Sequence, residues 1–396
     1  KPCIMAYPDV LTDSEEDREI AGFFTFRPCQ VSYVNGPHRD DQWGWLENYP
    51  QHGYVPETSV DGKTRYEETT VGVAQNTSPE REGHCGAFNV KDAQGRNFSF
   101  MNGFDPRPDG YLYGWNFSEQ WDRVYEIDPE VVFVTGWNEY IAGMWFEKDG
   151  WNGKPFSFVD QYNWNCSRDI EPNAGWGDKG DVYYLQLVDR VRKFKGMTPP
   201  DSVSAPKTIS LRRFSDWDEV TPHFASYRGN TFHRDADGAA NLHYIDSSGR
   251  NDIVLAKVAR DPKNLYFYVE CAEALSSRKD PHWMQLFIDV DRDKATGWNG
   301  YDFVVNRVSP SSRKAVLEKN VQGIWSWEET ARVKFFTKDN RLVVCIPREA
   351  LGIGAGEIDI EFKWNDNMQK EGDIMDFYVS GDTAPGGRFN YVYKTE

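Results

Sequence analysis

The sequence predicts an α/β domain with a parallel sheet, followed by an antiparallel β-sandwich. The chain has 396 residues, which is too long for one ordinary domain. Up to residue 197, short apolar runs alternate with helical segments, as in a parallel α/β fold. Beyond that point, short apolar or alternating runs recur about every ten residues with turn residues between them, which is typical of an antiparallel sandwich.

The first region, residues 1–197, is predicted to contain strands buried on both faces. Its apolar runs are short, continuous and bounded by Pro, Gly, Asn or Asp. A closed (β/α)8 barrel has eight strands. Either two strands are not recognised in the sequence, or the chain lacks the first part of such a barrel. The predicted strands are 3–8, 23–28, 43–50, 69–76, 131–138 and 156–162.

Helices are predicted between and after these strands, at 14–24, 117–128 and 181–196. Ser14 and Ser118 are the expected N-caps of the first two, because each precedes an acidic first turn. The third is strongly amphipathic and stops at a glycine, with two prolines shortly beyond it.

A Pro- and Ser-rich segment, residues 198–207, is the predicted linker between the two domains. The predicted sandwich occupies residues 208–396. Its strands are expected at 252–261, 264–271, 283–291, 300–308, 331–339, 341–349, 358–366 and 373–381.

The charge balance argues against two classes of partner. The net charge is -17, with 62 acidic and 45 basic residues. Nucleic acid is therefore not expected, since a phosphate-binding surface needs a basic patch. No stretch approaches the roughly 18 consecutive apolar residues of a membrane span. The chain starts at Lys1 without an initiator Met or a signal peptide, so it looks processed or truncated, and a secreted, periplasmic or cell-surface location is expected.

The numbers of aromatic residues and cysteines further limit the classes of protein to which the chain can belong. The chain contains 15 Trp, 20 Tyr and 24 Phe. Flat rings stack on the apolar faces of sugars, so this composition fits carbohydrate handling; the alternative is a large aromatic core. The six cysteines are widely spaced without a CxxC pair, which excludes a zinc ribbon and leaves free thiols or a disulfide open.

The stretch VVFVTGWNEY (131–140) places polar groups at the exit of a buried strand. In parallel α/β barrels, the carboxyl ends of the strands and the loops after them build the active site. Glu139 is therefore a candidate catalytic carboxylate, Asn138 could bind a hydroxyl, and Trp137 could wall a sugar ring. The alternative is that Glu139 only caps a following helix.

Two more acidic groups follow predicted strands and are surrounded by aromatic residues. The first lies in WGWLENYPQHGY and the second in FVDQYNWNCSRDIEP. In the second group, the alternative is that the arginine forms only a structural ion pair with its acidic neighbours. The candidate site residues are Trp45, Glu47 and His52 in the first group, and Asp160, Arg168 and Glu171 in the second.

Paired carboxyl groups are the usual requirement for cleaving a glycosidic bond. One is protonated and assists the leaving oxygen, while the other is ionised and activates water or attacks the anomeric carbon. Competing motifs are missing from the sequence: there is no nucleophile elbow, P-loop, dinucleotide-binding loop or H-E-x-x-H. The seven His are scattered, so a catalytic metal cluster is not expected.

VFVTGWNEY followed by RDIEP resembles two elements of glycoside hydrolase family 99 and the related family 71/99-like barrels. The resemblance covers about residues 1–197 and implies the later part of a (β/α)8 barrel. It matches Glu139 to a glutamate that assists attack by the sugar 2-hydroxyl. The family's second catalytic glutamate falls on Ala142, so the partner carboxylate is sought elsewhere: Glu47 first, then Glu171 and Asp160. The other reading is a pseudoenzyme.

The C-terminal region resembles the sandwiches of family 9 carbohydrate-binding modules over about residues 208–396. Within FIDVDRDKATGWNGYDFVVNR, three aspartates at alternate positions could ligate calcium through oxygens. The EF-hand pattern is not met, and an Asp-rich turn is the alternative. The candidate metal ligands are Asp289, Asp291 and Asp293, and the candidate sugar-stacking residues are Trp298, Trp325, Trp327 and Trp364.

These observations predict a glycoside hydrolase that acts on a polysaccharide or oligosaccharide through paired carboxylates. No cofactor is expected for catalysis, and a structural calcium ion is considered for the second domain. The alternative is a glycan-binding protein without catalysis. A polysaccharide lyase, whose base is commonly Tyr, His or Lys, is a weaker option.

Overall fold

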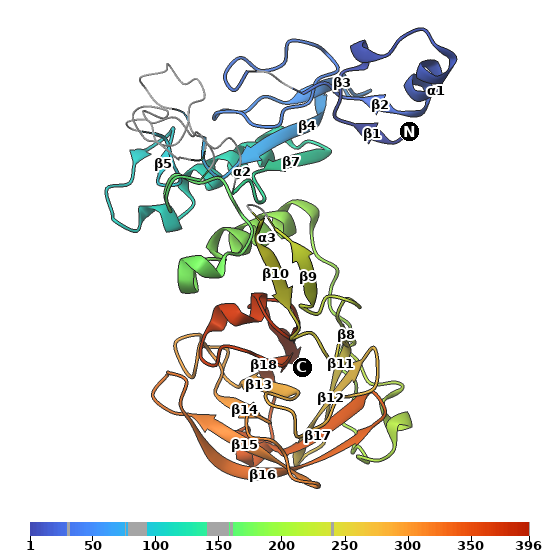
Figure 1. Cartoon of the computed structure of the whole chain (residues 1–396), viewed down its shortest axis with the longest axis vertical. Helices are drawn as coiled ribbons and strands as arrows, with labels where there is room; N and C mark the ends of the chain where they lie inside the picture. Colours follow the sequence, from blue (N-terminus) through green and yellow to red (C-terminus); the bar gives the residue numbers. More distant parts are fainter. Residues whose placement is uncertain are drawn as a thin grey trace. The chain divides into compact units, whose positions relative to one another are not determined.

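The computed structural model describes residues 1–29, 32–75, 77, 93–140, 158, 161–238 and 241–395. The chain divides into two compact units (Figure 1). The first unit comprises Lys1–Asn173 and Lys179–Met197, and the second comprises Ala174–Asp178 and Thr198–Glu396.

The first unit is built on a three-stranded mixed sheet. Its central strand pairs antiparallel with the strand before it and parallel with the strand after it. Two further pairs flank this sheet, one parallel and one antiparallel. The mixed sheet contains β3 (Tyr54–Thr58), β4 (Thr64–Gly72) and β7 (Val131–Thr135), and the pairs are β1 (Cys3–Ile4) with β2 (Thr25–Phe26) and β5 (Phe98–Ser99) with β6 (Gly103–Phe104).

The core of the first unit joins the end of β4 to two helices. Val71 from β4 packs with Phe117 and Trp121 from one helix and with Tyr183 from another. The apolar spacing of both helices therefore serves one shared core. The α-helices of this unit are α1 (Glu15–Phe23), α2 (Trp115–Ile127) and α3 (Val182–Lys195).

The predicted (β/α)8-type barrel is wrong. Among the described residues, the paired parallel strands are β1 with β2 and β4 with β7, and they do not form one continuous sheet. The segment 43–50 explains part of the difference, because it forms no strand and side chains hydrogen-bond part of its backbone. The Gly44 amide donates to the Glu68 carboxylate at 2.9 Å, and the Gln120 amide group donates to the Glu47 carbonyl at 2.8 Å. The predicted strand 156–162 lies mostly outside the described residues.

The second unit is dominated by one antiparallel sheet of eleven strands. The hydrogen-bonded order is β19-β18-β13-β14-β15-β16-β17-β12-β11-β8, and β20 also pairs with β18. Its strands are β8 (Phe224–Ala225), β11 (Ile253–Arg260), β12 (Asn264–Cys271), β13 (Gln285–Asp289), β14 (Phe303–Val305), β15 (Lys314–Asn320), β16 (Trp327–Lys338), β17 (Arg341–Pro347), β18 (Asp359–Asp366), β19 (Asp382–Ala384) and β20 (Tyr391–Lys394).

This sheet curls on itself, so the predicted two-sheet sandwich is also wrong. Phe224 of β8, at one end of the order, lies 5.1 Å from Phe362 of β18, near the other end. The amide of Ile253 in β11 donates to the carboxylate of Asp382 in β19 at 2.6 Å. One continuous ladder wraps the main core, as the lower part of Figure 1 shows. Alternation along each strand predicts which face is buried, but it does not predict how many sheets form.

The remaining elements are short. A separate antiparallel hairpin joins β9 (Arg234–Asp237) and β10 (His243–Asp246). The predicted strand 373–381 is instead largely a 3-10 helix, whose first turn is capped because the Asp373 carboxylate accepts from the Met375 amide. The 3-10 helices are η1 (Pro8–Val10), η3 (Gly110–Leu112), η4 (Ala174–Lys179), η5 (Phe214–Trp217), η7 (Arg348–Leu351) and η8 (Ile374–Tyr378).

Candidate functional site

The candidate site lies at the carboxyl edge of the parallel pair β4 and β7. The two strands are in register from Glu68 opposite Val131 to Gly72 opposite Thr135, so they end side by side. Residues that follow parallel strands leave the sheet at the same edge, which is where α/β proteins place their sites. The stretch Trp137–Asn138–Glu139 starts at this edge.

A glycine opens the turn that follows β7. Gly136 has a φ of +90°, and a Cβ atom there would lie 2.6 Å from the carbonyl oxygen of Arg168. The Ile170 amide donates to the Gly136 carbonyl at 3.0 Å, and the Glu171 amide donates to the Trp137 carbonyl at 2.9 Å. The loop that carries Arg168 therefore runs directly beside the end of β7.

Within this edge, a buried cation holds a half-exposed carboxylate. The Arg168 guanidinium donates to the Glu139 carboxylate at 3.1 Å. The Arg168 side chain is 3% exposed, whereas the Glu139 side chain is 41% exposed. The guanidinium carbon also lies 5.7 Å from the centre of the Trp45 ring. Beside them, Trp137 is 44% exposed and packs edge-on against Tyr184.

A second buried arginine fixes the loop that carries Arg168. Arg96 donates from Nε to the Ser167 carbonyl at 2.9 Å and from Nη2 to the Asp169 carbonyl. Its guanidinium carbon lies 4.2 Å from the centre of the Tyr183 ring. Burial lowers the pKa of Arg96, yet these carbonyl oxygens are acceptors suited to a charged donor. Arg96 thus connects the loop to α3.

Glu47 and His52 form a separate pair. The Glu47 side chain is 1% exposed and accepts from the His52 amide at 2.8 Å and the Tyr54 hydroxyl at 3.0 Å. It also bonds Nδ1 of His52, whose side chain is 48% exposed. This hydrogen bond to Glu47 raises the pKa of His52. Glu47 therefore orients an exposed imidazole, and its own carboxyl group is not accessible.

A buried acid that sequence reasoning missed is Glu68 in β4. It is fully buried, and its carboxyl accepts from the Gly44 amide at 2.9 Å. Burial raises the pKa of Glu68 to about 9, and the nearby Glu47 and Glu67 carboxylates act in the same direction. Glu68 is consequently protonated at neutral pH. The signal in the sequence is an acid next to the apolar end of a strand, in TRYEETTVG.

The structure brings only some of the predicted site residues together. Arg168 joins Glu139 to Trp45, and the backbone of Glu171 adjoins Trp137. Asn138 is exposed at the same turn. Glu47 and His52 bond to each other. Asp160, like Ala142, lies outside the described residues.

In the second unit, the predicted calcium ligands are brought together only in part. Oxygens of Asp289, Asp291 and Asp302 lie within 4.8 Å of one another, and Asp293 is not in this group. The Lys294 ammonium already bonds Asp289 at 2.7 Å, and backbone amides of the turn bond the same carboxylate. The structural calcium ion stays a prediction.

The predicted sugar-stacking tryptophans of the second unit belong to its cores. Trp298 is 3% exposed and Trp364 is fully buried, while Trp325 and Trp327 are partly buried against the same aromatic cluster as Trp298. Core packing therefore accounts for these rings. The described cysteines are free thiols: Cys3, Cys29, Cys166, Cys271 and Cys345.

No protein-family model matches the chain. A search of curated proteins finds no relative either. The function of this chain therefore has to be argued from its own residues. Within the described parts of the chain, no helix combines the length and apolar character needed to cross a bilayer.

Replacing Gly136 with Ala is expected to destabilise the protein by about 2 kcal/mol, because both the positive φ and the close carbonyl disfavour a Cβ atom. Denaturant unfolding measures this. The matched control is Gly62→Ala, where φ is +78° and nothing lies within 4 Å, so the backbone strain comes without the contact. Equal losses for the two variants would contradict the close packing of the Arg168 loop on β7.

Proposed function

We propose that the chain hydrolyses glycosidic bonds and that Glu139 is the ionised carboxylate of this reaction. One observation carries the proposal: Glu139 is half-exposed at the carboxyl edge of a parallel strand pair, next to an exposed tryptophan, and a buried arginine holds it. A neighbouring guanidinium favours the charged form of a carboxyl group. The exposed Trp137 ring offers a face on which a sugar ring can stack.

Hydrolysis needs a second carboxyl group, and Glu171 is the partner that this placement favours. Its backbone is hydrogen-bonded to that of Trp137 at 2.9 Å, so Glu171 and Glu139 stand on adjoining segments. Glu171 is half-buried, whereas Glu47 is enclosed by its own hydrogen bonds. In this scheme Glu171 donates a proton to the leaving oxygen, and Glu139 activates water or attacks the anomeric carbon.

A second aromatic surface in the first unit supports sugar as the substrate class. A cavity of about 360 Å³ is lined by Phe104, Asp105 and Trp115. Trp115 is 36% exposed and stacks against Tyr113 at 6.1 Å with an interplanar angle of 27°. The indole nitrogen of Trp115 donates to the Asp105 carboxylate at 2.7 Å. An exposed ring beside a carboxylate suits a sugar, which has apolar faces and hydroxyl edges.

Glycan binding without catalysis is the second candidate. The ion pair with Arg168 favours it, since one Glu139 oxygen is already engaged. Ala142, at the position where the resembling family has its second catalytic glutamate, favours it as well. The expected secreted, periplasmic or cell-surface location fits both candidates and stays a prediction.

The test is product analysis with a panel of neutral and acidic polysaccharides. The proposal expects new reducing ends from at least one polysaccharide, without an increase in near-ultraviolet absorbance. Binding of a polysaccharide without released reducing ends supports the second candidate and contradicts hydrolysis. A product that absorbs in the near ultraviolet indicates an unsaturated sugar, and hence a lyase.

A further inference from the structure

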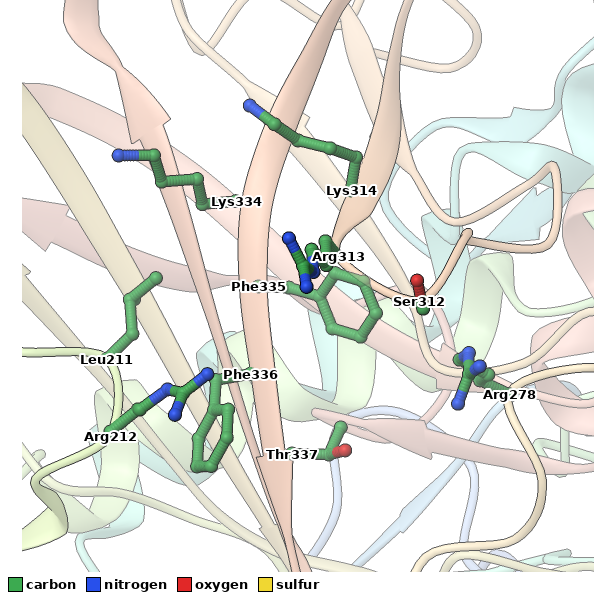
Figure 2. A pocket seen from close by; sticks show the side chains of 10 residues that line it. All are labelled: Leu211, Arg212, Arg278, Ser312, Arg313, Lys314, Lys334, Phe335, Phe336 and Thr337. Atoms are coloured by element: carbon green, nitrogen blue, oxygen red, sulfur yellow. The ribbon is translucent and has the colours of Figure 1, made fainter.

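A strongly basic pocket of about 460 Å³ lies in the second unit (Figure 2). Its cationic side chains come from four separate parts of the chain, and all of them are exposed. This concentration is unexpected in a chain with a net charge of -17. The pocket is lined by Leu211, Arg212, Arg278, Ser312, Arg313, Lys314, Lys334, Phe335, Phe336 and Thr337.

The pocket forms where a covering segment stops. Residues 209–220 pack over the outer face of β12 and β17, with Trp217 against Tyr268 at 5.1 Å. The cover reaches only as far as β16, where the Arg212 guanidinium carbon lies 5.4 Å from the centre of the Phe336 ring. Beyond it lie the exposed side chains of Lys314 in β15 and Lys334 in β16.

The two lysines of the pocket lie opposite each other on adjacent strands. Lys314 of β15 and Lys334 of β16 are cross-strand partners in the antiparallel ladder. Like charges placed opposite each other destabilise a sheet. Figure 2 shows both side chains extending from neighbouring strands. The stability of the sheet therefore does not account for two ammonium groups at these positions.

Within the part of the chain that the structure describes, the cations of this pocket have no carboxylate partner. Among the described residues, Arg212, Arg278, Arg313 and Lys334 form no ion pair with a carboxylate. The Lys314 ammonium donates only to a backbone carbonyl, that of Arg332 at 3.2 Å. Elsewhere in the same unit, exposed or buried arginines do pair: Arg292 bonds Asp359 and Arg307 bonds Glu318. The pocket is therefore complementary to a ligand with several negative charges.

We propose that this pocket binds an acidic oligosaccharide through the carboxylate or sulfate groups on its sugars. Arginine guanidinium groups bind such planar or tetrahedral anions with two parallel hydrogen bonds. The cavity volume falls in the range of sites for small ligands. Leu211 and Phe336 supply apolar surface for the ring faces of a sugar. The choice of a sugar over another anion rests on the proposed function, whereas the cation cluster itself does not.

Isothermal titration of the full chain with a heparin-derived tetrasaccharide and with tetragalacturonate tests the pocket. Lys314→Glu combined with Lys334→Glu is expected to weaken binding at least tenfold. The matched control, Arg228→Glu combined with Lys370→Glu, makes the same change in net charge at exposed cations outside the pocket lining and is expected to bind as the wild type does. High salt should weaken binding to the wild type.

A single Lys314→Glu change separates binding from folding. It places opposite charges across the ladder, so the thermal midpoint should rise while affinity falls. Equal weakening by the two double variants, no binding of either probe, or tighter binding of duplex DNA than of both sugars would each overturn the inference. Binding without any hydrolysis would overturn the proposed function alone, and hydrolysis without pocket binding would overturn this inference alone.

Discussion

Glu139→Gln is expected to lower the hydrolysis rate about 1,000-fold, within the range that a positioned acid or base contributes. The amide keeps the shape of the side chain and can still accept the hydrogen bond from Arg168, so the fold should persist. It removes the negative charge that activates water or attacks the anomeric carbon. We therefore expect kcat to fall while KM and the thermal midpoint change little, as measured by initial rates of reducing-end release.

The control for this variant is Glu130→Gln. Glu130 is exposed immediately before β7, at the opposite end of the strand from Glu139. The same chemical change at that end should leave kcat unaltered. Hydrolysis at the wild-type rate by Glu139→Gln would remove Glu139 from the reaction.

Glu68→Gln is expected to change the free energy of unfolding in favour of the folded state, by about 3 kcal/mol more near pH 7 than near pH 4. The pKa of Glu68 is raised to about 9 in the folded state by burial. Between its ordinary pKa and this value, the native state binds more protons than the unfolded state. The stability of the wild type therefore falls as the pH rises through this window. The neutral amide does not titrate, so the advantage of the variant should widen up to about pH 9.

Glu67→Gln, at the neighbouring position, is a control for which the pH dependence of stability is expected to have the opposite sign. The hydrogen bonds from Arg27, at 2.8 and 2.6 Å, lower the pKa of Glu67. This group contributes stability above its unfolded pKa, which is lost as the pH falls through the folded value. Glu67→Gln should destabilise the protein near neutral pH and have little effect in acid. Urea unfolding across pH measures both variants, and a pH-independent effect of Glu68→Gln would show that folding does not raise the pKa of Glu68.

Local patterns predicted several individual elements, although the N-cap of α2 is Gly114 and not the predicted Ser118. The segment predicted as a strand at 264–271 coincides with β12, and the predicted helix 181–196 matches α3. Ser14 caps α1 as expected, since its side chain accepts from the Asp17 amide. Short-range periodicity and capping chemistry determine such elements, and both can be read from adjacent residues.

The arrangement of the elements could not be predicted in the same way. The strand β15 was not predicted, although its residues Ala315–Glu318 are buried, because charged residues flank this short run. The curling of the large sheet depends on contacts such as Phe224 with Phe362, which are 138 residues apart in sequence. Contacts of this range leave no periodic signal, which is why the predicted two-sheet sandwich was wrong.

The site residues show the same division. The position of Glu139 at a strand exit followed from the apolar run before it, and its neighbour Arg168 was a predicted site residue. The ion pair between them depends on Gly136, because the missing side chain lets the loop with Arg168 pack against the end of β7. This contact between distant segments cannot be predicted from the sequence. The buried Arg96 was missed because its sequence neighbours do not indicate burial, whereas the apolar residues that follow Glu68 were a signal of burial that was not recognised.

Chemical rescue of Glu139→Ala by azide tests whether the carboxylate of Glu139 acts on the sugar. The substrate is an activated aryl glycoside of the sugar that product analysis identifies, whose leaving group departs without an acid. We expect an almost inactive variant whose rate recovers with azide, with the azide attached to the anomeric carbon of the product. Unchanged hydrolysis by Glu139→Ala, or inactivity that azide does not relieve, would contradict a carboxylate at this position acting on the sugar.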